Sequence, residues 1–261
     1  MNVGGEELVV ASDHELARFG ALEAGRALLT LRAELGFEDS KRLRDQGDRI
    51  AHELLMKLLA EQRPDDAVLS EEGADDQERL AARRVWIVDP LDGTREFGET
   101  GRTDWAVHVA LIENGEPVAA AVSLPARDLV MSTSPAPCAP QRPPGRLRLV
   151  VSRSHTPPEA LAVAEALDAE LVYMGSAGAK TMAVVLGDAD AYLHLGGQYE
   201  WDSAAPVGVA LAAGLCATRA DGSPLRYNRQ NPWLPDQVVC RADLHDAVVS
   251  AVRSAVAASA H

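Results

Sequence analysis

The sequence has few cysteines, few basic residues for its acidic content, and no long hydrophobic run. Its three cysteines are widely spaced and form no CxxC pair, which indicates free thiols in a reducing cytoplasm rather than a disulfide framework. Apolar runs long enough to span a bilayer are absent. Because the N-terminal residues contain no basic segment followed by an apolar one, we expect no signal peptide, no membrane association and a cytoplasmic location.

The shortage of basic residues excludes another class of partner. The sequence has 25 Lys and Arg against 39 Asp and Glu, so its formal net charge is −14. Proteins that wrap nucleic acid need a basic surface, and we therefore expect no nucleic-acid partner. An anionic substrate would need local cations, and bound metal ions can reverse the local field.

What the sequence does contain is a hydrophobic fraction of 47% in 261 residues, enough for a sizeable core in one large domain or two modest ones. Ser12 and Glu15 form a capping box for a first helix, predicted over Asp13–Ala33. A second helix is predicted from an apolar face that begins at Ile50, with Asp48 at its N-terminal end.

Strand patterns follow the two predicted helices. AVLS before Glu71 and VWIV before Asp89 are predicted strands, and a β-hairpin is predicted around Asn114-Gly115. The proline-rich residues 134–145 are predicted to form a loop. Beyond them strand and helix patterns alternate, which favours an α/β half, and an amphipathic helix near the C-terminus is predicted to serve packing alone.

Acidic residues stand at the ends of three of these predicted elements. One pair follows the first strand, and a second pair brackets a predicted turn at Pro90. A single residue is placed at the N-cap of a helix that has Pro206 in or near its first turn. Each of the five alone has an alternative role as a solvated loop residue, a turn residue or a helix cap. The five are Glu71, Glu72, Asp89, Asp92 and Asp202.

Taken together, these carboxylates predict a cation site. Two like charges about 4 Å apart cost roughly 4 kcal/mol at an effective dielectric constant near 20, a large part of the roughly 5–15 kcal/mol stability of a domain. A converging cluster must therefore hold protons or cations, and oxygen ligands without His or Cys select Mg²⁺ before Zn²⁺. Asp89, the Leu91 carbonyl and Asp92 can coordinate two ions. Gly93 and Thr94 would begin a short helix, and the N-terminus of such a helix suits a phosphate.

The motifs resemble those of the inositol monophosphatase-like family of Mg²⁺-dependent, Li⁺-sensitive phosphatases. The resemblance rests on SEE (70–72), DPLDGTREF (89–97) and EWDSAAP (200–206), and it covers nearly the whole chain. It implies an α/β fold of the αβαβα five-layer sandwich type, usually a homodimer, which hydrolyses a small-molecule phosphate ester without a covalent intermediate. It also implies two or three Mg²⁺ ions and inhibition by Li⁺.

The resemblance implies roles for individual residues. Thr94 helps to activate the nucleophilic water, Asp48 pairs with Thr94, and Glu72 supports a third metal or its waters. The implied metal ligands are Glu71, Asp89, the Leu91 carbonyl, Asp92 and Asp202. The implied substrate contacts are Glu71, Leu91, Asp92, Gly93, Thr94, Ser176, Gly178, Lys180 and Asp202. We expect residues 1–142 to carry the main metal site, and residues 143–261 to carry the last ligand and the residues that determine specificity.

Local motifs narrow the substrate. Arg95-Glu96-Phe97, VSRSH (151–155) and GSAGAK (175–180) look like the branch that acts on 3′-phosphoadenosine 5′-phosphate, whereas inositol monophosphatases typically have Thr-Asn-Phe at the first of these places. Lys180 is either a contact for an extra phosphate or a solvated helix residue. Arg153 and His155 have the same two interpretations, as ligand contacts or as surface polar groups.

The predicted function is removal of the 3′-phosphate of 3′-phosphoadenosine 5′-phosphate to give AMP, in the recycling of sulfur-assimilation nucleotides. A phosphatase for inositol 1-phosphate or fructose 1,6-bisphosphate stays open as an alternative, as does a non-catalytic metal- or phosphate-binding protein. Haloacid-dehalogenase phosphatases have a similar Asp-x-Asp-Gly-Thr sequence, but in DPLDGT the two aspartates are three residues apart instead of two.

Overall fold

Two helices at the start of the chain form the outermost layer, and the predicted capping box of the first is present. The Ser12 hydroxyl accepts from the Glu15 amide, and the Glu15 carboxylate accepts from the Ser12 amide. These helices are α1, Asp13–Leu35, and α2, Ser40–Gln62. The computed structural model describes residues 12–259. Residues 1–11, on which the expectation of no signal peptide rests, lie outside the described residues.

Helix α2 begins earlier than predicted. Asp39 caps it by accepting from the Arg42 amide at 2.9 Å. Asp48 therefore lies in the middle of the helix, and its predicted place at the N-terminal end is wrong. The apolar face that marked the helix begins only at Ile50, while the preceding turns are mostly polar and carry little hydrophobic periodicity. A mid-helix position holds the Asp48 side chain more rigidly than a fraying end would.

The second layer is a five-stranded sheet with the order β1-β2-β3-β4-β5, in which β1 is parallel to β2 and the other neighbours are antiparallel. The predicted hairpin joins β3 to β4. Its turn residues Asn114 and Gly115 have φ of 53° and 79°, the positive values that such a two-residue turn requires. The strands are β1 Ala67–Ser70, β2 Arg84–Asp92, β3 Ala106–Glu113, β4 Glu116–Leu124 and β5 Leu129–Ser132.

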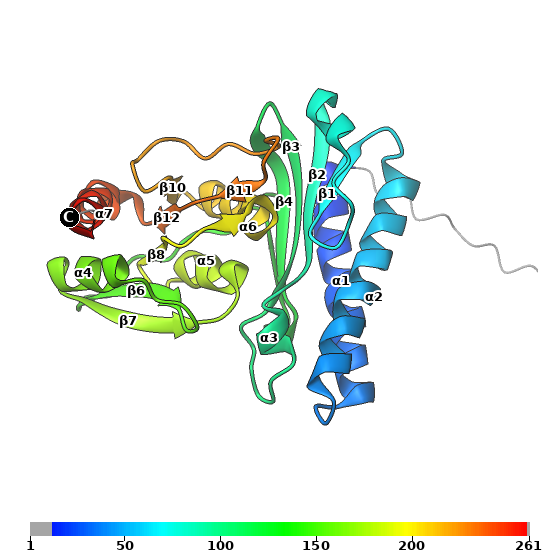
Figure 1. Ribbon diagram of the computed structural model, residues 1–261, viewed down its shortest axis with the longest axis horizontal. Coiled ribbons are helices and arrows are strands. Elements are labelled where there is room, and N and C mark those ends of the chain that lie inside the picture. Colours follow the sequence, from blue (N-terminus) through cyan, green and yellow to red (C-terminus); the bar gives the residue numbers. More distant parts are fainter. Residues whose placement is uncertain (1–11, 260–261) are drawn as a thin grey trace, which may run out of the picture.

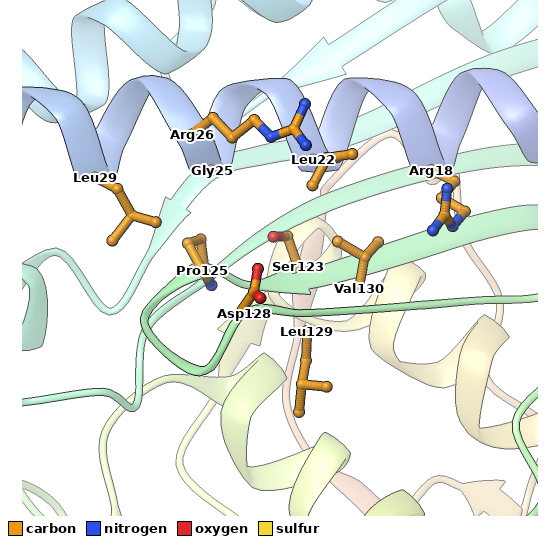
Figure 2. Close-up of a pocket in the computed structure, with 10 residues that line it drawn as sticks. All are labelled: Arg18, Leu22, Gly25, Arg26, Leu29, Ser123, Pro125, Asp128, Leu129 and Val130. Carbon is orange, nitrogen blue, oxygen red and sulfur yellow. The ribbon is translucent and has the colours of Figure 1, made fainter.

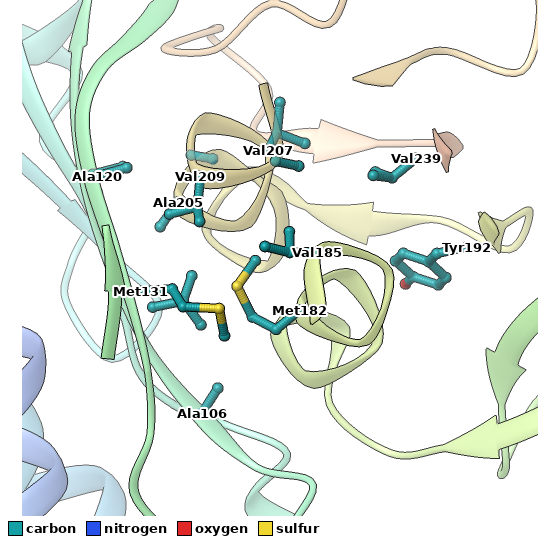
Figure 3. Close-up of a cluster of buried hydrophobic side chains, with 14 of the residues drawn as sticks. Ala106, Ala120, Met131, Met182, Val185, Tyr192, Ala205, Val207, Val209 and Val239 are labelled. Atoms are coloured by element: carbon teal, nitrogen blue, oxygen red, sulfur yellow. The ribbon is translucent and has the colours of Figure 1, made fainter. Parts of the chain in front are cut away.

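Two helices fill the space between this sheet and a second one, as Figure 1 shows. They are α5, Ala177–Leu186, and α6, Glu200–Ala212. Figure 3 shows their apolar side chains meeting the sheet, with Met182 of α5 close to Met131 of β5. This buried cluster joins the two halves of the chain, because it contains residues from both sheets and both helices.

The second sheet has the order β10-β12-β8-β6-β7, and helices α4 and α7 cover its outer face (Figure 1). The α, β, α, β, α layering confirms the predicted fold class, and the proline-rich residues 134–145 form a connection outside helices and strands as expected. None of the helices within residues 12–259 has the length and apolarity needed to cross a membrane. The remaining strands and α-helices of the second half are β6 Leu147–Ser152, α4 Pro158–Ala166, β7 Ala169–Met174, β8 Ala191–His194, β9 Gln198–Tyr199, β10 Cys216–Thr218, β11 Trp233–Leu234, β12 Gln237–Cys240 and α7 His245–Ser259.

Candidate active site

The end of β2 carries two of the predicted ligands, Asp89 and Asp92. The chain does not turn at Pro90 as predicted; it stays in the strand, and the register with β3 shifts between Asp89 and Asp92. Proline has no amide hydrogen to give to the ladder, which favours such an irregularity. In a regular strand, residues three apart point to opposite faces. The bulge instead brings both buried carboxylates to the same place.

Asp202 joins them from the first turn of α6. Tyr199 is the N-cap residue, so the predicted position of Asp202 as the cap is wrong by three residues. The Asp202 carboxylate reaches back and accepts from the Tyr199 amide at 2.7 Å. Pro206 lies inside the helix rather than near its start. Ligand oxygens of Asp89, Asp92 and Asp202 lie within 4.8 Å of one another, and we call this group the acidic cage.

The acidic cage fits a hard divalent cation, because its donors are carboxylate oxygens brought together from two elements. Burial and the surrounding carboxylates raise the pKa of Asp202 to about 7. Burial, with the charges of Glu71 and Asp92, raises the pKa of Asp89 well above its ordinary value. Without a cation, these carboxyls therefore take up protons more readily than ordinary aspartates do.

Glu71 and Glu72 follow β1 directly, as predicted, and both side chains keep contact with solvent. Glu71 is in hydrogen-bond contact with Asp89 at the rim of the cage. The pKa of Glu71 is raised to about 7, because surrounding protein atoms partly bury its carboxyl group and Asp92 carries a like charge. The structure therefore brings Glu71 to the acidic cage. Glu72 instead lies near Asp48, and its charge helps to raise the pKa of Asp48.

Thr94, the first residue of the short helix α3, Thr94–Phe97, connects the cage to α2. Its hydroxyl donates to the Leu91 carbonyl at 2.9 Å and lies 3.3 Å from Asp48 Oδ1. Burial and the charge of Glu72 raise the pKa of Asp48 to about 7. The predicted pair of Asp48 and Thr94 is thus assembled, and the carboxyl is poised to exchange a proton near neutral pH.

The predicted substrate residues of α5 contact Asp92. The Ser176 hydroxyl and the amides of Ala177 and Gly178 all donate to its carboxylate. The Lys180 side chain is only 3% exposed, and its ammonium donates to the Gly175 carbonyl, so Lys180 is not a solvated helix residue. The hydrogen bonds from Ser176, Ala177 and Gly178 hold Asp92 in place. Burial raises the pKa of Asp92, but the charge of the nearby His108, together with the Ser176 and Gly178 hydrogen bonds, outweighs burial and lowers it to about 2.

His108 is a site residue that the sequence motifs do not reveal. It is fully buried in β3, with Nδ1 3.0 Å from the Trp201 carbonyl and Nε2 3.2 Å from Asp92 Oδ2. Burial lowers the pKa of His108, but the Asp92 carboxylate outweighs burial and raises it. The sequence offered one signal for His108, namely a histidine inside the apolar run AVHVAL (106–111). That histidine comes close to Asp92 only when the sheet has formed.

Glu96 and Arg153 form an ion pair between the two halves. Arg153 Nε lies 2.6 Å from Glu96 Oε1, and its Nη2 lies 2.6 Å from Glu99 Oε1. Phe97 is buried and packs edge-on against Trp105 at 5.0 Å. Glu96 is therefore held by an ion pair, Phe97 packs in the core, and Arg153 is anchored rather than free on the surface.

A cleft of about 240 Å³ adjoins the cage, between α3 and the segment before α5. Its lining combines residues from both halves of the chain, and Gly93, with φ of 83°, is tightly fitted because an added Cβ would lie 3.0 Å from the Ser176 side chain. A separate pocket of similar size lies between α1 and the β4–β5 connection (Figure 2) and contains none of the predicted site residues. The cleft is lined by Asp92, Gly93, Thr94, Arg95, Glu96, Ser154, Gly175 and Ser176.

The protein without metal is expected to lose stability as the pH rises from about 5 to 8. The pKa of Asp48, Glu71 and Asp202 is raised to about 7 from ordinary values of 3.8 and 4.5. Between those values the folded state binds more protons than the unfolded state, so the stability present at low pH is lost as the pH rises through 7. Glu71 contributes little because it is exposed and solvent screens its charge. From Asp48 and Asp202 we expect the free energy of unfolding to fall by at least ~1 kcal/mol, which lowers Tm by about 2–4 °C.

Differential scanning fluorimetry in EDTA across this pH range measures the effect. Saturating Mg²⁺ should flatten or reverse the slope, because the cation takes the place of the protons. A Tm in EDTA that is constant or rises from pH 5 to 8 would contradict the assigned pKa shifts.

The layered fold and the acidic cage between its halves define a class of metal-dependent phosphatases, and comparison with known proteins agrees. A model of the inositol monophosphatase family matches residues 9–257, and the chain belongs to this family. It is 52% identical over 254 residues to 3′-phosphoadenosine 5′-phosphate phosphatase of Mycobacterium leprae, which covers 93% of this chain and 94% of that protein.

Two further relatives support the placement. The 3′(2′),5′-bisphosphate nucleotidase CysQ of Escherichia coli K12 is 32% identical over 72% of this chain and 80% of its own length. The crystal structure of CysQ from Bacteroides thetaiotaomicron, a bacterial member of the inositol monophosphatase family, superimposes with a TM-score of 0.77. It has 29% identity and covers 90% of this chain and 99% of that one. The family resemblance predicted from the motifs is thus confirmed.

Proposed function

We propose that this chain is a phosphatase that removes the 3′-phosphate of 3′-phosphoadenosine 5′-phosphate to give AMP. The observation that carries the proposal is 52% identity, over 93% of the chain, to a phosphatase named for this substrate. The acidic cage beside a cleft supports it, because a phosphate ester needs cations next to these carboxylates before it can bind. The proposed setting is the recycling of sulfur-assimilation nucleotides in the cytoplasm, and the proposed assembly is a homodimer.

The carboxylates of the cage, with Glu71 and the Leu91 carbonyl, would hold two or three Mg²⁺ ions. When bound, Mg²⁺ offsets the acidic charge and polarises the phosphate oxygens. Glu72, outside the cage, is proposed to support a third ion or its waters. Li⁺ is expected to inhibit by competing for the same oxygen ligands.

Thr94 and Asp48 orient the attacking water in this proposal. In the reaction the Thr94 hydroxyl turns its proton from the Leu91 carbonyl, 2.9 Å away, to Asp48 Oδ1, 3.3 Å away, while its oxygen accepts a hydrogen bond from the water. Asp48, with a pKa of about 7, takes up that proton near neutral pH. Gly93 and Ser176 line the cleft where the phosphate lies, whereas Gly178 and Lys180 are buried behind it and are proposed to act by holding Asp92 and the start of α5.

Parallel assays of phosphate release with Mg²⁺ test the proposal. We expect the highest kcat/KM with 3′-phosphoadenosine 5′-phosphate, lower values with inositol 1-phosphate and fructose 1,6-bisphosphate, and loss of activity in EDTA or on Li⁺ titration. A higher kcat/KM for inositol 1-phosphate would reverse the assigned substrate. No release from any ester would favour a binding protein, and a burst of product would favour a phosphoenzyme, which direct attack by water does not form.

A further inference from the structure

We propose that three aromatic residues beside the acidic cage, Tyr199, Trp201 and Trp233, form the binding site for the nucleobase of the substrate. This inference rests on the proposed function and deepens it, because it assigns the residues that distinguish a nucleotide from other phosphate esters. We call these three residues the aromatic cluster.

The aromatic cluster is preorganised and open to solvent. The rings of Tyr199 and Trp201 stack at 4.6 Å with an interplanar angle of 9°, and Trp233 meets Tyr199 edge-on at 5.2 Å. Pairing of β9 with β11 places Tyr199 opposite Trp233 and fixes their relative position. Tyr199 and Trp233 remain 41% and 43% exposed. Single exposed aromatics are ordinary on a protein surface, whereas Tyr199 and Trp233 are in contact and expose one contiguous aromatic surface, the kind of feature that marks interaction sites when it is large.

The aromatic cluster is tied directly to the cage. The Tyr199 amide donates to Asp202 Oδ2 at 2.7 Å, and Asp202 is itself a member of the cage. Trp201 is linked to the cage as well, because its carbonyl lies 3.0 Å from His108 Nδ1 and His108 Nε2 lies 3.2 Å from Asp92. A ligand whose phosphate lies at the cage therefore has the aromatic cluster within reach.

A second connection runs through the cleft. Ser154 lines the cleft, and the next residue, His155, lies beside Gly196, where an added Cβ would be 3.3 Å from the His155 ring. The Trp233 ring covers the following residue, Gly197, so closely that a Cβ there would overlap it. The wall of the cleft thus leads through residues 154–155 and 196–197 to the aromatic cluster.

The chemistry of a nucleoside 3′-phosphate fits this arrangement. Its base and its scissile phosphate are carried by one ribose, so the base must come to rest one sugar away from the cage. Stacking of a base on an aromatic ring contributes substantially to binding and tolerates any base, because every base has a π-face. Inositol and fructose phosphates have no such face, so the aromatic cluster would favour nucleotides over them.

Substitution of Trp233 and Tyr199 tests the inference. In Trp233→Leu, apolar bulk still covers Gly197 but the aromatic face is gone, and Tyr199→Ala keeps the backbone amide that bonds Asp202. For both variants we expect KM for 3′-phosphoadenosine 5′-phosphate to rise ~5–100-fold, with a much smaller change for inositol 1-phosphate. Tyr199→Phe should retain most of the kcat/KM, and Tyr173→Ala, an exposed aromatic on β7, is the matched control.

Calorimetric titration with AMP, compared with inorganic phosphate, gives a readout that is independent of turnover. We expect Trp233→Leu to weaken AMP binding and to leave inorganic phosphate binding little changed. Equal losses for nucleotide and inositol substrates, or no loss for either, would overturn the inference. Failure of the proposed function has a different signature, in which the wild-type protein itself prefers inositol 1-phosphate or releases no phosphate from any ester.

Discussion

Replacing Asp89 by Asn is expected to lower kcat by ~10²–10³-fold or more, the range for losing one preorganised electrostatic group from a site. Asp89 is buried at the end of β2, and its carboxylate is shared between the cage and Glu71. An asparagine has nearly the same shape but no charge, so it weakens the hold on a divalent cation. Steady-state assays over a Mg²⁺ titration measure the loss of kcat. Added Mg²⁺ should restore kcat only in part.

The same variant is expected to be more stable than the wild-type protein when both are free of metal. Burial and like charges raise the pKa of Asp89, so the charged form is unfavourable in the folded state, and asparagine removes that repulsion. Each ~1 kcal/mol regained would raise Tm by about 2–4 °C in EDTA. Asp65→Asn, at an exposed aspartate outside the cage, is the control and should change neither quantity. Wild-type turnover in Asp89→Asn would exclude Asp89 as a ligand.

Removing the hydroxyl of Thr94 is the second change for which we expect a large loss of kcat. We expect Thr94→Ala to lower kcat by ~10²–10⁴-fold, the usual contribution of proton transfer by a positioned group, with KM little changed. The hydroxyl lies between the Leu91 carbonyl and Asp48, so it affects water activation more than substrate binding. Thr94→Ser keeps the hydroxyl and should recover most of the activity.

Asp48→Asn provides the coupling test for Thr94. If the two residues act as a unit, the double variant should be hardly slower than either single variant, because removing one already disables the pair. Multiplicative losses would mean that Asp48 and Thr94 act separately. A fall in kcat/KM that comes only from a higher KM would assign Thr94 to substrate binding.

The sequence predicted those parts of the site that depend on short-range spacing. Asp89 and Asp92 lie at the end of one strand and Glu71 follows another, and hydrophobic patterns mark both strands clearly. The structure brings Asp89 and Asp92 together in the cage and places Glu71 beside Asp89 at its rim. The predictions were wrong where the result depends on the local backbone conformation. Pro90 forms a bulge rather than a turn because the neighbouring strand continues the ladder, which cannot be known from the proline alone.

Longer-range relations could not be predicted from local patterns. The start of α2 lies in a polar segment, which misplaced Asp48, and its proximity to Thr94 depends on how α2 packs against β2. The pairing of Arg153 with Glu96 joins residues that are 57 positions apart. Similarly, His108 becomes part of the site only when the sheet, α5 and α6 meet.

The contact between His108 and α5 has a consequence for how the sequence can change over time. A side chain at position 178 would overlap the His108 ring, so the histidine fits only while that position is glycine. A lineage can replace Gly178 only after residue 108 has become smaller, and a smaller residue at 108 in turn leaves Asp92 without its imidazole neighbour. We therefore expect replacements at these two positions, far apart in the chain, to be coupled.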